Sequence, residues 1–182
     1  ALPGIERVGV STGGRTFAVT VNDVQTWLGV ETTTPDFFAT VGVTPAIGRN
    51  PTGDEMRQQT AVVLTQSAWR QLFPKRTSID GARVTIADRE YTVVGVLGAG
   101  FETLMYGDVW IPAASAGELE GLANPAIIAR LRAGVDSISI RPQLATVAAN
   151  FTAAYVAPGA PPYEIRFHGL RPKPPSLRDS EL

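Results

Sequence analysis

The stretch GARVTIADREYTVVGVL, residues 81–97, carries the clearest strand signal in the chain. Val84 and Ile86 alternate with polar residues, the letters ADRE supply a turn, and YTVVGV returns with β-branched and aromatic side chains. Alternation with a period of two on both sides of a short polar connection predicts a β-hairpin. The connection is too short for a crossover between parallel strands, so the two strands are predicted to be antiparallel.

The glycines that follow this hairpin form the pattern G-x-x-G-x-G over residues 95–100. A dinucleotide-binding loop has the order G-x-G-x-x-G and opens a long helix. Here the order differs, and the strand predicted at residues 108–112 comes too soon for such a helix. We therefore interpret the glycines as a turn that lets Trp110 pack back on the same sheet.

Upstream, residues 15–32 alternate in the same way around Asn22-Asp23 and predict another hairpin. Further strands are expected at residues 5–11, 60–66, 126–134 and 163–170. Short helices are expected at residues 33–42, 67–74 and 141–154. Thr34 and Ser67 are the predicted N-caps of the first two helices, and Gly42 is expected to end the first. The chain is thus expected to have an α+β fold with mainly antiparallel pairing.

Composition excludes several classes of function. The chain has 182 residues, of which 44% are hydrophobic, and its 16 basic and 17 acidic residues give a net charge of −1. The basic residues form no stripe, which argues against a nucleic-acid groove. The absence of cysteine excludes disulfides, thiolate zinc sites and cysteine nucleophiles. No apolar stretch reaches the roughly 18 residues of a membrane span.

No constellation of side chains predicts catalysis. His168, the single histidine, alternates with exposed positions of a predicted edge strand, so we expect it on the surface. The closest carboxylate pairs, Asp54-Glu55 and Glu118/Glu120, lack the pattern of a calcium loop and are expected to be solvated. Asp54-Glu55 is better interpreted as the start of a turn or helix. We therefore expect no enzyme activity, and no catalytic, cofactor-binding or metal-binding residue is assigned.

Aromatic side chains could line a pocket, but each is predicted to occupy the inward phase of its own element. These residues are Trp27, Phe37, Phe38, Trp69, Phe73, Tyr91, Phe101 and Trp110. Because aromatic side chains bury large apolar areas, a role in the core is favoured over a ligand site.

Five segments, in this order and spacing, resemble the MacB-like periplasmic core domain of ABC-transporter permeases. They are TTTPDFFATVGVTPAIGR (32–49), AVVLTQSAWRQLFP (61–74), IDGARVTIADREYTVVGVLGAGF (79–101), DVWIP (108–112) and IIARLRAGV (127–135). Within the first segment Gly42, Pro45 and Gly48 shape a loop. Arg49 is expected to bind local carbonyls or a carboxylate, with contact to a substrate as the less favoured reading.

The resemblance implies two subdomains. A porter-like βα module would be formed by both chain ends, residues 1–28 and 114–172. A small, mainly antiparallel module with short helices would be inserted at residues 29–113, and residues 173–182 would be an extended tail leading to a missing membrane helix.

The implied function is that of the extracytoplasmic, periplasmic domain of an ABC-transporter permease in the bacterial cell membrane. It would couple ATP-driven motion of membrane helices to the export or extraction of a substrate. Its implied partners are the flanking transmembrane helices, an ABC ATPase, a second permease copy and a periplasmic adaptor or outer-membrane protein. The alternative is a stand-alone extracytoplasmic module that binds a ligand or a protein.

Overall fold

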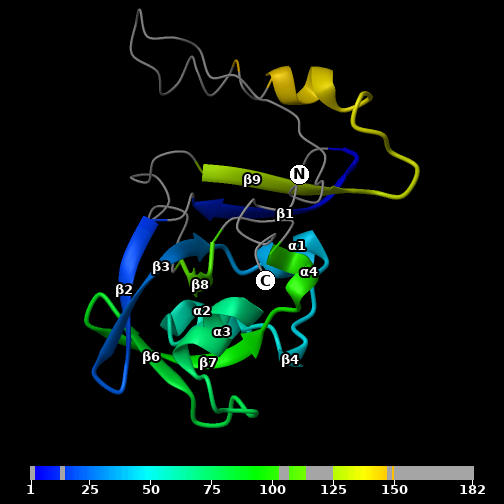
Figure 1. The fold of residues 1–182 in the computed structure, drawn as a ribbon. Helices are drawn as coiled ribbons and strands as arrows, with labels where there is room; N and C mark the ends of the chain where they lie inside the picture. Colours follow the sequence, from blue (N-terminus) through cyan, green and yellow to red (C-terminus); the bar gives the residue numbers. More distant parts are fainter. Residues whose placement is uncertain (1–2, 13–14, 103–106, 114–124, 147–148, 150–182) are drawn as a thin grey trace, which may run out of the picture.

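The computed structural model describes residues 3–12, 15–102, 107–113, 125–146 and 149. The strands are β1 (Ile5–Thr12), β2 (Arg15–Val21), β3 (Val24–Thr33), β4 (Ile47–Gly48), β5 (Ala61–Leu64), β6 (Arg83–Ile86), β7 (Arg89–Val96), β8 (Val109–Pro112) and β9 (Pro125–Leu131). The helices are α1 (Phe37–Val41), α2 (Gly53–Gln58), α3 (Gln66–Leu72) and α4 (Ala99–Glu102). The chain is thus of mixed α+β character with more strand than helix, as expected (Figure 1).

Six strands pair into a closed ring. Their order is β2-β6-β7-β5-β8-β3, and an additional β2–β3 pairing joins the last strand to the first. Pairing is antiparallel except between β3 and β8 and between β5 and β7, which agrees with the expected predominance of antiparallel pairs. We call these six strands the ring. Because each of these strands has a neighbour on both sides, the ring has no edge strand.

The predicted hairpins are both present in the ring. Asn22 and Asp23 connect β2 to β3, with φ of 47° and 65°. Ala87 and Asp88 connect β6 to β7, with φ of 47° and 62°. Two consecutive residues with positive φ are the requirement of a type I′ turn, whose twist matches that of the strands it joins.

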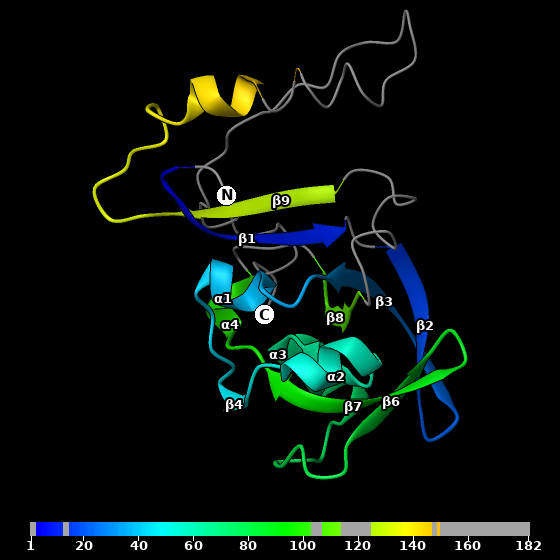
Figure 2. The same cartoon turned by 180° about the vertical axis from the view of Figure 1, so that it is seen from behind.

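The remaining long strands, β1 and β9, form a two-stranded antiparallel unit that we call the ribbon. Their register runs from Ile5 opposite Leu131 to Thr12 opposite Pro125. In Figures 1 and 2 the ribbon lies across one side of the molecule, with α1 and α4 beneath it. The helical residues 141–146 lie on the other side of the ribbon.

The ring encloses the larger hydrophobic cluster. Every ring strand contributes a buried side chain to it, and α3 adds its apolar face; the ring members include Val19, Leu28, Val30, Val62, Leu64, Val84, Ile86, Tyr91, Val93, Val96 and Val109. In α3, Trp69 and Phe73 stack with ring centroids 4.6 Å apart. Burial of apolar surface from all six strands is the main stabilising term of this part of the molecule.

A smaller cluster separates the ring from the ribbon. It consists of Phe37, Phe38, Ala61, Val63, Val94, Leu97, Phe101 and Trp110, and Ile128 of β9 packs against it. Ala61 and Val63 alternate along β5 with residues of the larger cluster, as expected for a strand that is buried on both faces. We call this cluster the interlayer.

The structure corrects both predicted helix caps. Thr34 does not cap α1; its Oγ1 accepts from the N–H of Val10 in β1 at 2.9 Å. Asp36 is the N-cap residue of α1 and its side chain makes no capping bond, whereas Gly42 ends the helix with φ of 79°, as expected. For α3 the N-cap is Thr65 and not Ser67, since Thr65 Oγ1 accepts from the N–H of Ala68 at 3.1 Å.

Two segments expected to be loop or turn contain helix. Residues 43–55 were expected to form a loop, but β4 lies within them. The expected start of a turn or helix at Asp54-Glu55 is present as the first turn of α2, where Thr52 and Glu55 form a capping box. The glycine-rich segment after β7 leads into the one-turn helix α4. Trp110 nevertheless packs on the sheet as expected, with an exposure of 1%.

The third predicted helix is present in part. Residues 141–146 are helical, and the remainder of the predicted helix 141–154 lies largely outside the described residues. The predicted strand 163–170 and the tail 173–182 lie wholly outside them.

Candidate functional site

The ribbon meets the ring at one place along the backbone, which we call the joint. Ser11 of β1 and Thr33 of β3 are the one pair in register between these strands. Beside them the N–H of Thr34 donates to the carbonyl of Val10 at 3.0 Å, and Thr34 Oγ1 accepts the return bond from Val10. Through this short pairing the ribbon continues the sheet from β3.

Helix α1 lies directly against the ribbon because residue 9 has no side chain. A Cβ at Gly9 would lie 2.7 Å from the Cα of Phe37, closer than van der Waals contact allows. Phe37 and Phe38 then point into the interlayer and meet edge to face at 5.2 Å. The backbones of β1 and α1 are therefore in direct contact.

Arg130 of β9 ties the second ribbon strand to the same helix. Its Nε donates to the carbonyl of Thr40 at 3.0 Å, which satisfies an acceptor in the last turn of α1. Gly42 makes room for this guanidinium, since a Cβ there would meet Arg130 Nη2. Both ribbon strands thus contact α1, one by packing and one by a hydrogen bond.

Glu31 is the buried acid of the joint. The exposure of this β3 residue is 4%, and its carboxylate accepts a very short hydrogen bond from the hydroxyl of Ser11 in β1. Burial raises the pKa of Glu31 to about 7, against the opposing effect of the bonds from Ser11 and Trp110. The indole N–H of Trp110 lies near the carboxyl without the geometry of a regular hydrogen bond.

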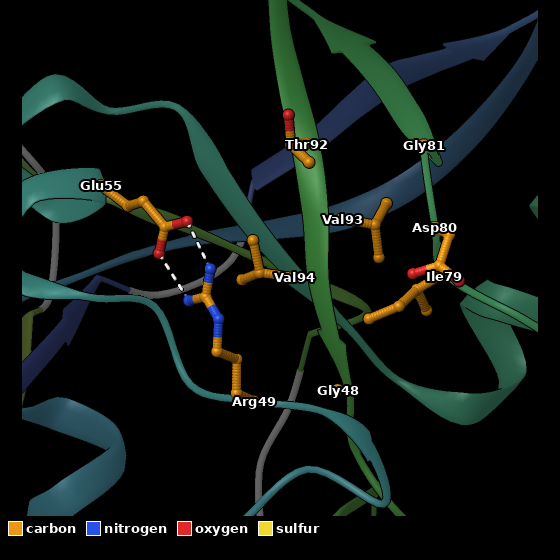
Figure 3. Close-up of a pocket in the computed structure, with 9 residues that line it drawn as sticks. All are labelled: Gly48, Arg49, Glu55, Ile79, Asp80, Gly81, Thr92, Val93 and Val94. Carbon is orange, nitrogen blue, oxygen red and sulfur yellow. Dashed lines mark hydrogen bonds and ion pairs between the residues drawn. The ribbon is translucent and has the colours of Figure 1, made fainter.

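A second polar site lies in an open hollow of about 450 Å³ beside β7. Its lining residues are drawn in Figure 3, where the Arg49 guanidinium faces the Glu55 carboxylate. Two bonds of 2.7 Å join these groups, and a further bond of 3.1 Å joins Arg49 to the carbonyl of Asn50. The expected role of Arg49 as a partner of local carbonyls and a carboxylate is thus confirmed.

The Arg49–Glu55 pair shifts the pKa of both groups. Hydrogen bonds from Arg49 lower the pKa of Glu55 to about 2, and the carboxylate in turn raises the pKa of Arg49. Glu55 also accepts from the backbone N–H of Thr52 at 2.7 Å as part of the capping box. The Arg49 guanidinium thus already has its acceptors within the chain, and its role in the hollow is to bind Glu55 and the Asn50 carbonyl.

Aromatic residues occupy the core as expected, with one correction. Trp27 is 69% exposed, on the outer face of β3, whereas the other seven aromatic residues named from the sequence are buried. The inward phase of β3 belongs to Leu28 and Val30, which lie in the larger cluster. The strand alternation was read correctly, but the face that carries Trp27 was assigned wrongly.

Of the residues considered for metal binding, some lie within the described part of the chain and some lie outside it. Asp54 and Glu55 lie at the start of α2, where Glu55 binds Arg49. Glu118, Glu120 and His168 lie outside the described residues. Among residues that the structure describes, no group of three or more potential metal ligands comes together.

Glu31 is a site residue that sequence reasoning missed. In the alternation of β3 it shares a phase with the exposed Trp27, which indicates an outward, solvated side chain. It is buried because β1 and β8 flank this end of β3, through the Ser11–Thr33 and Glu31–Trp110 pairs. An acid followed directly by three threonines, residues 32–34, gave no signal by itself.

None of the helices among the described residues is long and apolar enough to cross a bilayer. No curated protein matches the chain. Its fold, however, resembles that of solved structures from several bacteria.

The periplasmic region of MacB from Actinobacillus actinomycetemcomitans has a TM-score of 0.65 and 18% identity, over 84% of this chain and 68% of that one. The extracellular domain of the noncanonic ABC-type transporter YknZ from Gram-positive bacteria has a TM-score of 0.64 and 14% identity, over 83% and 76%. A domain assigned to a permease protein from Porphyromonas gingivalis has a TM-score of 0.61 and 20% identity, over 81% and 71%.

These likenesses establish the fold, and the sequence itself establishes the family. The profile of the MacB-like periplasmic core domain matches residues 1–147, which includes the ring, the ribbon and the joint. The chain therefore belongs to the MacB-like periplasmic core domain family, the periplasmic domains of ABC-transporter permeases.

Proposed function

We propose that this domain transmits mechanical displacement: ATP-driven motion of the permease's membrane helices enters through the ribbon and reaches the ring, where it drives export or extraction of a substrate. The observation that carries the proposal is the joint, in which a ribbon and a closed ring meet through one pair of residues in register. Such coupling requires an element with two arrangements and no catalytic group.

The polar ties around the joint support this role. Val10–Thr34 and Arg130–Thr40 connect the ribbon to residues beside or within α1. Both are individual hydrogen bonds, whereas the ring is held by a continuous apolar interior. Displacement of the ribbon against the ring therefore breaks a few bonds and leaves the larger core intact.

The division into two subdomains is proposed with an adjusted boundary. Val19 and Leu28 belong to the cluster that includes Val62 and Val84, so residues 15–28 are grouped with the ring and not with residues 5–12. On this division the ribbon and the segment that follows it form the porter-like module. The ring with α1–α4 forms the inserted one.

The implied partners are part of the proposal. They are the flanking transmembrane helices, an ABC ATPase and a second permease copy, with an adaptor or outer-membrane protein beyond the membrane.

The exposed Trp27 favours a second candidate function, that of a protein-interaction module, because a tryptophan on an outer sheet face is typical of contact surfaces.

The test is to loosen the joint in the intact permease with its ATPase. Thr34→Val combined with Arg130→Ala removes one tie from each ribbon strand, and Trp27→Ala serves as the matched surface control. We expect ATP hydrolysis to continue in the double variant while transport falls several-fold. Native transport per ATP in the double variant would refute mechanical transmission, and a loss confined to Trp27→Ala would favour the interaction module.

A further inference from the structure

Across the joint, a side chain of the ribbon contacts a buried acid of the ring. Ser11 and Glu31 are both nearly inaccessible, with exposures of 1% and 4%. Their contact lies next to the Ser11–Thr33 pair, where the backbone of β1 meets β3. Any separation of ribbon and ring must therefore open this contact and admit water to the carboxyl group.

We infer that the Ser11–Glu31 contact is a proton-controlled latch that sets how tightly the ribbon is held to the ring. The inference rests on the proposed function, because it specifies how that joint is regulated. A neutral carboxyl fits the buried site, and its ionised form favours the opened joint, where water reaches it.

Among the residues that the structure describes, no cation contributes to the pKa of Glu31. On β1 the facing group is the neutral hydroxyl of Ser11, and on β8 it is the indole of Trp110. Asp108, just before β8, directs Oδ2 to the N–H of Gly29 at 2.9 Å. Arg130 on β9 donates to Thr40, Asp36 beside α1 is exposed, and the side chain of Glu102 in α4 lies outside the described set.

The space around the carboxyl is also closed on its other side. A Cβ at Gly107 would lie 2.9 Å from Glu31 Oε1, and Gly107 has φ of 112°. The buried carboxyl is thus in contact with the backbone before β8 as well as with β1. Hydration of an ionised Glu31 requires that β1, the neighbour joined by the fewest bonds, moves away.

The sign of the pH effect follows from the buried state. Burial raises the pKa of Glu31 from 4.5 to about 7, so the closed joint binds its proton more tightly than the opened joint does. The closed joint is therefore favoured at low pH, loses stability as pH rises from about 4.5, and shows no further change above about 7. The hydrogen bond from Ser11 lowers the pKa of Glu31, so removal of the Ser11 hydroxyl is expected to raise that pKa further.

Amide hydrogen exchange measured by NMR on the 182-residue chain between pH 5 and pH 8 tests the latch, with rates corrected for intrinsic exchange. The reporters are the N–H groups of Val10 and Thr34, which form the bonds across the joint, and the internal control is the ring N–H of Val93, bonded to Ala82. We expect protection of the reporters to fall at least tenfold over this range and that of Val93 to stay unchanged.

Three variants give the inference its sharpest test. Glu31→Gln is expected to abolish the pH dependence and to keep the reporters protected throughout. Ser11→Ala is expected to move the levelling-off to higher pH, which a purely structural serine would not do. Asp36→Asn, an exposed acid near the joint, is expected to behave like the native chain.

Two results would overturn the latch: a pH dependence that persists in Glu31→Gln, or loss of protection in Val93 together with the reporters. If Glu31→Gln fails to fold, a carboxyl-carbon titration of the native chain decides instead, and a pKa near 4.5 contradicts the inference. The exchange experiment does not measure transport per ATP. A negative result therefore contradicts the latch alone, and the mechanical role is tested separately.

Discussion

The ring and the ribbon are stabilised in opposite ways. In the ring each strand pairs on both sides around a shared apolar interior, and the two-residue turns are matched to the strand twist. The ribbon pairs along its length and packs on the interlayer. It joins the ring through one registered pair, the two Val10–Thr34 bonds, a hydroxyl–carboxyl contact and an arginine bond to a helix carbonyl. The ring therefore depends on burial, while the joint also depends on a few polar groups that can be exchanged for water.

The largest expected effect lies in the ring interior. Leu64→Ala removes a side chain with 0% exposure, and we expect it to lower the free energy of unfolding by about 3 kcal/mol. Chemical denaturation of the chain measures this. Trp27→Ala is the control and should change stability by less than about 0.5 kcal/mol. Equal losses for both variants would mean that the ring is not the stable part.

A methyl group at position 9 tests the contact between ribbon and helix. Gly9→Ala places a Cβ 2.7 Å from the Cα of Phe37, and we expect a loss of about 2 kcal/mol. Gly53→Ala makes the same chemical change in α2, where the nearest atom would be an arginine nitrogen 3.4 Å away, and should be nearly neutral. If thermal denaturation gives the same result for both glycines, the backbone approach at the ribbon is not tight.

Removing one acceptor at the joint has a smaller effect. Thr34→Val keeps the shape of the side chain and leaves the N–H of Val10 without its 2.9 Å partner. We expect a loss of about 1 kcal/mol and faster exchange of the Val10 amide. Thr16→Val, on an exposed position of β2, is the matched control and should leave that amide unchanged.

The Arg49–Glu55 pair should give the smallest effect, and at acid pH only. The pKa of Glu55 is lowered to about 2, so the pair contributes stability above about pH 4.5 that is lost as pH falls toward 2. The Arg49 side chain is 54% exposed, which limits the contribution to about 1 kcal/mol. The stability difference between the native chain and Glu55→Gln should shrink over this range; a constant difference contradicts the assignment.

Local patterns in the sequence predicted the local elements well. Alternation over residues 81–97 and the Asn22-Asp23 turn gave both hairpins, because the side-chain period of a strand and the needs of a type I′ turn are local properties. The N-caps of α1 and α3 were predicted wrongly, although capping is also a local property. Thr65 and Ser67 are two residues apart, are both capable of capping α3, and are 3.1 Å apart at their hydroxyl oxygens.

Closure of the ring could not be predicted in the same way. It depends on β2 meeting β6 through Val19–Ile86 and Thr20–Thr85, and on β3 meeting β8 in parallel. These pairings join segments distant in sequence, and no spacing rule specifies them. Glu31 was missed for the same reason, since its burial comes from strands other than its own.

The parallel pairing of β3 with β8 has a consequence for synthesis on the ribosome. Val30 lies opposite Val109, so one side of β3 stays unpaired in a growing chain until β8, which lies far along the sequence, has emerged. Contacts between such distant segments form slowly, and an exposed strand can join another chain in the meantime. The nascent domain therefore has an interval of exposure that ends when β8 pairs with β3.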